Sequence, residues 1–185
     1  MVRFLLTYLR MSTRSSSIAA AAFVVSVVLS TPVCAQQVLP GVQLGGAAGI
    51  SIPTGHLNDF YSAGFNLSGL AQIHAPNEYV GARAEVLWER FDHKQSAPAA
   101  GNKNSVAFVL NAMYFVPEYA LRPYFIGGMG LYSVSDQGNH PGFNLGLGMD
   151  IPLSGVSAHF EARLHRVLTD GAKYTTVPFS FGIRF

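Results

Sequence analysis

From residue 36 onward, hydrophobic and polar positions alternate with a period of two, not with the 3.6-residue period of a helix. In the last segment, one face carries mainly large apolar side chains, at Val177, Phe179, Phe181, Ile183 and Phe185. The other face carries smaller or polar ones, at Thr176, Pro178, Ser180, Gly182 and Arg184. Clusters of Gly, Pro, Asn and Asp interrupt the alternating segments at regular intervals. The pattern therefore predicts an all-β protein.

The alternation predicts eight strands, at 42–53, 64–75, 79–91, 104–116, 121–134, 141–152, 156–168 and 174–185. Each is longer than the roughly 5 to 6 residues of an ordinary strand and long enough for the roughly 9 to 11 residues that a tilted strand needs to cross a bilayer. Long connections at 56–63 and 92–103 alternate with short ones at 76–78, 117–120 and 153–155. We therefore expect a closed antiparallel up-and-down eight-stranded transmembrane β-barrel, with both ends of the barrel domain on the periplasmic side.

The period alone does not say which face points inward, because a soluble barrel places its apolar face inside. The polar face here is small and ionic, which suits a narrow lumen, whereas the apolar face suits lipid. The inward ionic side chains are then Arg83, Glu85, Glu89, Arg122, Glu161, Arg163 and Arg184, called the ionic ladder below. Because buried charges require partners, we expect them to pair and fill the lumen. The alternative is that some pairs break to open a pore.

Residues 1–35 have the pattern of a cleaved secretory signal peptide, with basic residues, an apolar stretch at 18–29 and Val33-Cys34-Ala35 before the cleavage point. The barrel domain is then 36–185, which contains no cysteine and has 9 basic against 10 acidic residues. This balance argues against a nucleic-acid partner. Disulfides and thiol chemistry are also excluded from the mature domain.

The sequence resembles the outer membrane protein A-like eight-stranded barrels, a class that includes the opacity-type surface proteins. The resemblance rests on the segments 49–55, 81–85, 122–132, 160–166 and 177–185. It implies that Phe181, Ile183 and Phe185 form the C-terminal signal that the barrel assembly machinery reads. The resemblance says little about activity, because this superfamily includes adhesins, lipid-modifying enzymes, small-ligand conduits and wall-tethering proteins.

No catalytic, cofactor-binding or metal-binding site is expected. His159, Glu161 and His165 point inward from one strand, but six residues at about 3.3 Å place the two histidines roughly 20 Å apart. A shared metal is therefore disfavoured, and hydrogen bonds within the lumen are the better interpretation. No serine stands beside His165, as a lipid-modifying enzyme with a Ser-His pair would require.

Five basic residues lie in or next to the predicted outer loops, at Arg90, Lys94, Lys103, Arg166 and Lys173. They are candidate contacts to the phosphates of lipopolysaccharide, with a generic solvated rim as the alternative. The predicted function is a non-enzymatic structural or surface role in the outer membrane, in contact with its lipids. The alternative is a narrow conduit for small solutes or apolar molecules, for which small inward residues would leave space, at Gly45, Ala47, Gly49, Gly128, Gly146 and Gly148. A lipid A-modifying enzyme is the less favoured third possibility.

Overall fold

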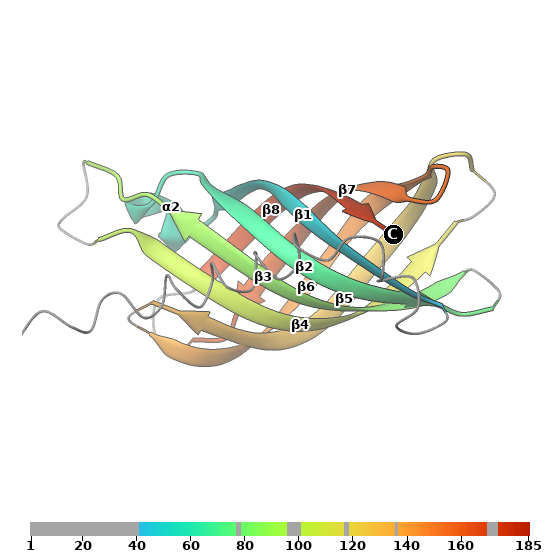
Figure 1. Cartoon of the computed structure of the whole chain (residues 1–185). Helices are drawn as coiled ribbons and strands as arrows, with labels where there is room; N and C mark the ends of the chain where they lie inside the picture. Colours follow the sequence, from blue (N-terminus) through green and yellow to red (C-terminus); the bar gives the residue numbers. More distant parts are fainter. Residues whose placement is uncertain (1–40, 77–78, 96–100, 117–118, 136, 170–173) are drawn as a thin grey trace, which may run out of the picture. The chain divides into compact units, whose positions relative to one another are not determined.

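The alternating segments form long antiparallel strands in the computed structural model, which describes residues 41–185 except 77–78, 96–100, 117–118, 136 and 170–173. The predicted signal peptide lies outside the described residues. Within the described part, eight strands and one short helix follow each other along the chain (Figure 1). They are β1 (Val42–Pro53), α2 (His56–Phe60), β2 (Gly64–His74), β3 (Val80–Phe91), β4 (Lys103–Phe115), β5 (Arg122–Val134), β6 (Gly138–Pro152), β7 (Ser157–Val167) and β8 (Tyr174–Arg184).

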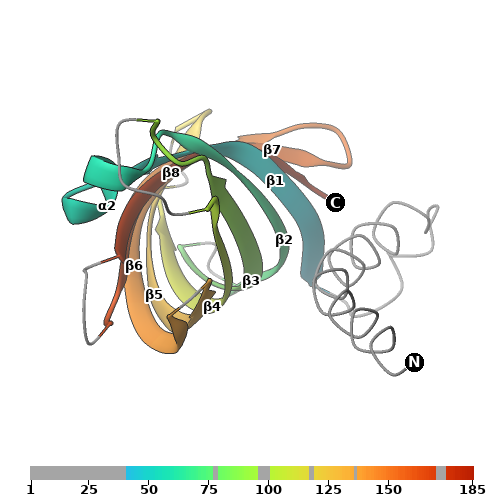
Figure 2. The ribbon, with the colours of Figure 1, turned by 90° about the vertical axis from the view of Figure 1, so that its left-hand side faces the viewer.

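Each strand pairs with the next, and β8 pairs with β1, so the sheet closes into a barrel. The closing register joins Gly45 to Arg184 and Pro53 to Thr176. Leu44 and Phe185 extend it by exchanging two backbone hydrogen bonds of 3.0 and 2.9 Å. Figure 2 shows the strands as a ring around the lumen. The predicted closed up-and-down barrel is confirmed.

Two local features differ from the prediction. β6 begins at Gly138, three residues before the predicted start, because the positive φ of Gly138 (84°) allows a tight turn and Val134 pairs directly with Gly138. α2 was not predicted, since five residues are too few to show a helical period. No helix in the described part of the chain is long and apolar enough to cross a bilayer.

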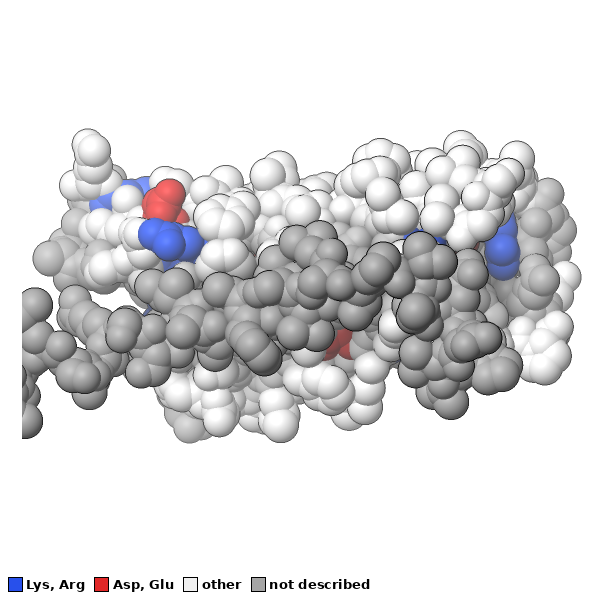
Figure 3. Space-filling model, in the orientation of Figure 1, with Lys and Arg blue, Asp and Glu red and all other residues white. Residues whose placement is uncertain are grey.

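The outward face is apolar over the middle of the barrel. Phe125, Met129 and Leu145 are 61%, 73% and 65% exposed, whereas Arg83 and Glu85 on the inward face are 2% exposed. This arrangement is the one that the small, ionic character of the polar face predicted. In Figure 3, basic and acidic side chains lie together at the end that carries α2, further basic side chains lie toward the opposite end, and most of the visible described surface is uncharged.

The two ends of the barrel differ. At one end, called the α2 end, lie α2 and the connections 54–63, 92–102, 135–137 and 168–173. At the other, called the terminal end, lie the start of β1, the end of β8 and the connections 75–79, 116–121 and 153–156. The predicted alternation of long and short connections is clearest in the first half of the chain, because the 135–137 connection at the α2 end is itself tight.

The lumen is less uniformly polar than predicted. Buried apolar side chains gather in one cluster toward the α2 end, made of Leu57, Tyr61, Leu87, Phe91, Ala107, Val109, Tyr132, Val134, Val167 and Tyr174. A smaller cluster toward the terminal end contains Met113, Phe115, Tyr124 and Ile126. Most of these residues come from β4 and β5, whose inward positions carry few charges. The ionic side chains therefore share the lumen with two apolar clusters.

Candidate functional site

The ionic side chains of β3 and β7 meet across the lumen. Both strands run in the same direction and are four positions apart around the ring in either sense. Their inward positions read Arg83 then Glu85 on β3, and Glu161 then Arg163 on β7, so that unlike charges face each other at both levels. Arg83 Nη1 donates to Glu161 Oε2 at 2.6 Å, and Arg163 Nη2 donates to Glu85 Oε1 at 2.7 Å. Two ion pairs thus tie opposite walls of the barrel together.

Glu161 is the centre of this network. Its Oε1 lies 2.7 Å from Arg163 Nε, which links the two levels along β7. Its Oε2 also accepts a hydrogen bond of 2.6 Å from the Tyr124 hydroxyl of β5. On the other side, Arg83 Nε donates to Gln72 Oε1 of β2 at 3.0 Å. Side chains from four strands are therefore joined by buried, charge-assisted hydrogen bonds, which are the stronger kind.

The remaining members of the ionic ladder are placed differently. Arg184 of β8 pairs with Asp150 of β6, an inward carboxylate that the sequence analysis left out of the ladder. Glu89 is 1% exposed and accepts a hydrogen bond of 3.4 Å from the Thr176 hydroxyl, with no ion pair among the described residues. Arg122 lies half-buried at the terminal end, with its guanidinium 5.7 Å from the centre of the Phe115 ring. Glu89 thus stands outside the ion pairs between the described residues.

Inward glycines make room for these side chains. A Cβ atom at Gly146 would lie 2.5 Å from Cγ of Arg163, and one at Gly148 would lie 2.4 Å from Cζ of Tyr124. At Gly45 it would lie 2.7 Å from Cγ of Arg184. A Cβ atom at Gly49 or at Gly128 would lie just as close to the backbone of the neighbouring strand. The space that these glycines were expected to leave for a conduit is therefore occupied by side chains and backbone.

The inward histidines make their contacts with other residues of the lumen. His165 Nδ1 lies 2.9 Å from the Tyr132 hydroxyl, with the two rings edge to face. His159 lies against Gly182, where a Cβ would come within 2.2 Å of the imidazole. Among the described residues, no hydrogen bond joins a serine hydroxyl to a histidine ring, and no cluster of three His, Cys, Asp or Glu side chains has the geometry of a metal site.

The predicted lipopolysaccharide contacts do not form one group. Arg90 and Arg166 lie on outward positions of β3 and β7 near the α2 end, and Arg90 Nε is 3.9 Å from Asp92. Lys94 donates through Nζ to the backbone carbonyl of Asn58 in α2. Lys103 is only 7% exposed and points into the barrel mouth, so the prediction of an exposed contact is wrong for this residue. Lys173 lies outside the described residues.

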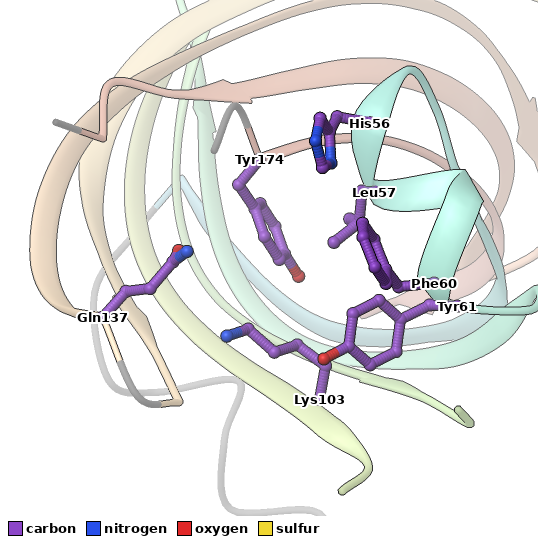
Figure 4. Close-up of a pocket in the computed structure, with 7 residues that line it drawn as sticks. All are labelled: His56, Leu57, Phe60, Tyr61, Lys103, Gln137 and Tyr174. Atoms are coloured by element: carbon purple, nitrogen blue, oxygen red, sulfur yellow. The ribbon is translucent and has the colours of Figure 1, made fainter. Parts of the chain in front are cut away.

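A pocket of about 260 Å³ lies in the barrel mouth beneath α2 (Figure 4). Four residues of the α2 segment line it, namely His56, Leu57, Phe60 and Tyr61, together with Lys103, Gln137 and Tyr174. This pocket was not predicted, because its lining comes from four parts of the chain. The local signals were Leu57, Phe60 and Tyr61, which are apolar or aromatic residues within a predicted long loop.

The three residues of the predicted assembly signal lie on the outward face of β8. Phe181, Ile183 and Phe185 are 44%, 48% and 47% exposed. Phe181 also packs against Phe160 of β7, with ring centres 4.8 Å apart. The outward face of β8 thus presents a row of apolar side chains to the surroundings of the barrel.

Several solved structures are similar to this chain. Neisserial surface protein A matches with a TM-score of 0.59 and 17% identity, over 78% of this chain and 96% of that one. The outer membrane enzyme PagL matches with a TM-score of 0.50 and 12% identity, over 77% and 98%. The Yersinia pestis outer membrane protein Ail, in a phospholipid nanodisc, matches with a TM-score of 0.50 and 15% identity, over 77% and 99%. At these identities the likeness shows the fold alone.

A comparison with curated proteins gives no match. The family model for the outer membrane protein beta-barrel domain, in contrast, matches residues 21–185, which include every described strand. The resemblance to outer membrane protein A-like and opacity-type barrels is thereby confirmed, and the apolar outward face is the surface that meets membrane lipid. The chain belongs to the outer membrane protein beta-barrel domain family, whose place is the bacterial outer membrane.

Proposed function

We propose that this protein is a non-enzymatic structural and surface protein of the outer membrane, which contacts lipopolysaccharide through its α2 end. The observation that carries the proposal is the cross-braced lumen. Two ion pairs between β3 and β7 hold opposite walls together at 2.6 and 2.7 Å, and inward glycines fit closely against the side chains involved. A filled and braced barrel is suited to a scaffold that presents its loops at the cell surface.

The connections support an orientation with the α2 end outside. Outer membrane barrels have short periplasmic turns and longer external loops. The turns 75–79, 116–121 and 153–156 at the terminal end are short, whereas 54–63 and 92–102 at the α2 end are longer. We therefore place both ends of the barrel domain in the periplasm, where the preceding signal peptide would be removed after Ala35.

The lipopolysaccharide contact rests on Arg90, Lys94 and Arg166 among the described residues. Arg90 and Arg166 lie on outward positions of opposite strands near the α2 end, beside lipid-facing Phe65 and Phe143 respectively. The Arg90 side chain is 42% exposed, and its neighbour Asp92 is 3.9 Å away, so the guanidinium is accessible to a phosphate. Guanidinium groups bind phosphate oxygens through paired hydrogen bonds, so Arg90 and Arg166 are suited to bind the phosphates of lipopolysaccharide.

The test is a comparison of stability in bilayers with and without lipopolysaccharide. The barrel is reconstituted into nanodiscs of phospholipid alone or phospholipid with lipopolysaccharide, and the urea midpoint of unfolding is measured. We expect lipopolysaccharide to raise the midpoint, and the double variant Arg90→Gln/Arg166→Gln to lose most of that increase. The matched control Arg90→Lys/Arg166→Lys keeps the charges and should retain part of the increase in the urea midpoint. An equal increase in the glutamine variant would overturn the proposal.

The two alternative functions have less support. A conduit requires a continuous passage, and the inward glycines that suggested one are packed against Arg163, Tyr124 and Arg184. A lipid A-modifying enzyme requires an activated nucleophile. PagL is an enzyme, but at 12% identity it shares only the fold with this chain.

A further inference from the structure

Arg90 has a polar neighbour on the outward face near the α2 end. β4 buries Lys103 and Ser105 and turns Asn104 outward, and the register places Asn104 directly opposite Arg90 of β3. Directly paired residues on one face of an antiparallel sheet have Cβ atoms about 5 Å apart. A neutral amide and a guanidinium therefore stand side by side at the same height of the barrel wall.

An aromatic pair lies next to Arg90, toward the middle of the barrel. Trp88 is two residues earlier on β3, about 7 Å along the strand, and it points outward as Arg90 does. Its ring meets that of Phe65 edge to face, with ring centres 5.2 Å apart. Trp88 is paired with Leu67 of β2 and Val106 of β4, which are both exposed on the outward face. The polar groups at Arg90 therefore adjoin an apolar surface that suits an acyl chain.

Asp92 competes for the Arg90 guanidinium. Its Oδ1 lies 3.9 Å from Arg90 Nε, and the Asp92 side chain is 72% exposed. Such a long and exposed ion pair contributes little to stability, so a phosphate can replace it at Arg90. The Asp92 backbone is held independently, because its carbonyl accepts a hydrogen bond of 3.0 Å from the Ser62 N–H. The Asp92 carboxylate should therefore lower the affinity of Arg90 for an anion without being needed for the local fold.

From this arrangement we propose that the outward face of β2, β3 and β4 near the α2 end binds one phosphorylated glycolipid of the lipid A type. Arg90 would bind the phosphate through paired hydrogen bonds. The Asn104 amide both donates and accepts, so it would bind hydroxyl or amide groups of the adjoining sugar. One acyl chain would lie against Phe65 and Trp88. The inference rests on the proposed lipopolysaccharide contact and narrows it to one wall, because Arg166 of β7 lies on the opposite wall.

Trp88 is the only tryptophan of the chain, so its fluorescence reports on the lipid beside it. The barrel is reconstituted into vesicles of brominated phosphatidylcholine, whose bromine atoms quench a neighbouring indole. A series of vesicles then contains increasing mole fractions of unbrominated, bisphosphorylated lipid A. EDTA is present throughout, so that no divalent cation bridges Asp92 to a phosphate.

We expect the Trp88 fluorescence to recover at lower mole fractions of lipid A than random exchange of lipids predicts. Unbrominated phosphatidylglycerol, which carries a phosphate but no sugar, should require a higher mole fraction than lipid A for the same recovery. Recovery of the fluorescence only as random exchange predicts, or equal recovery with both lipids, would overturn the proposal.

Variants test the roles of Arg90 and Asp92. Arg90→Gln should lower the binding of lipid A relative to phosphatidylcholine about threefold to tenfold, and Arg90→Lys should lower it less, because it keeps the charge but loses the paired hydrogen bonds. Asp92→Asn should raise this relative binding about twofold. The matched control Asp59→Asn removes one exposed carboxylate of α2 at the same end and should leave the binding unchanged. Equal increases in the two asparagine variants would contradict a site at Arg90.

Failure of this inference and failure of the proposed function give different results. If lipopolysaccharide raises the urea midpoint but Trp88 recovers only as random exchange predicts, the contact lies elsewhere on the barrel and the site assignment alone is wrong. If neither measurement responds, both are wrong. Each variant is first checked for heat-modifiable gel migration, so that only folded barrels are compared.

Discussion

Arg83 on β3 and Glu161 on β7 lie 2.6 Å apart across the lumen, although three strands separate them in either direction around the barrel. The sheet itself places no hydrogen bond between these strands. Their contact, with the Arg163 to Glu85 pair one level away, therefore adds a constraint on the barrel cross-section that backbone pairing does not supply. The stability of the barrel should depend on this network to an extent that can be measured.

Replacing Glu161 by glutamine is expected to lower the free energy of unfolding by about 3 kcal/mol, because Arg83 and Arg163 would both lose a buried partner. Urea unfolding in lipid vesicles, followed by tryptophan fluorescence, measures the change. A double-mutant cycle with Arg83→Met and Glu161→Met isolates the pair. We expect the double variant to be less destabilised than the sum of the two single variants, and strict additivity would contradict a direct interaction.

Replacing Gly146 by alanine should cost about 1 to 3 kcal/mol of stability, since the new methyl group would overlap Cγ of Arg163 and the Ala162 carbonyl. Gly69→Ala is the matched control, because a Cβ there would meet nothing within 4 Å and alanine restricts the unfolded chain. The control should be neutral or slightly stabilising. Similar midpoints for the two variants would show that the lumen has space beside Arg163.

The refolded barrel should give no single-channel conductance in planar bilayers. The apolar cluster of the α2 end, which includes Leu87, Phe91 and Tyr132, lies across the passage in addition to the ion pairs. Glu161→Gln should therefore remain silent as well. A reproducible small conductance that increases in this variant would instead identify the ion pairs as a gate and support the conduit alternative.

Labelling of single cysteines should distinguish the two ends. Ser62 at the α2 end and Ser154 at the terminal end are both exposed, and the barrel domain has no cysteine of its own. In intact cells, a membrane-impermeant maleimide is expected to label Ser62→Cys and not Ser154→Cys, whereas permeabilised cells should show both. The reverse pattern in intact cells would invert the proposed orientation.

Phe185→Ala should slow assembly of the barrel into proteoliposomes that contain the barrel assembly machinery, measured as the fraction with heat-modifiable migration over time. Phe143→Ala on β6 is the matched control, because Phe143 is 44% exposed on the outward face and Phe185 is 47% exposed. Loss of lipid contact is then comparable in both variants. Equal assembly rates would argue against a recognition signal in the last strand.

The strand segments could be predicted because alternation is local and each face has a constant environment. β3 and β4 deviate from the predicted bounds by no more than one residue at either end. Where the signal was weak, the prediction failed. The strand was predicted to begin at Pro141, but the positive φ of Gly138 makes the turn three residues earlier, and Pro141 lies within β6 opposite Leu131.

The sequence by itself determined that the eight strands between Val42 and Arg184 form a barrel with an apolar outward face, and that Arg83, Glu85, Glu161 and Arg163 point inward. A period of two specifies the face of each residue, and nothing about its partner across the lumen. Only the tertiary structure decided that Arg83 meets Glu161, that Asp150 receives Arg184 and that Lys103 turns into the mouth. These choices depend on the register and closure of the barrel, which bring together residues that are far apart in the chain.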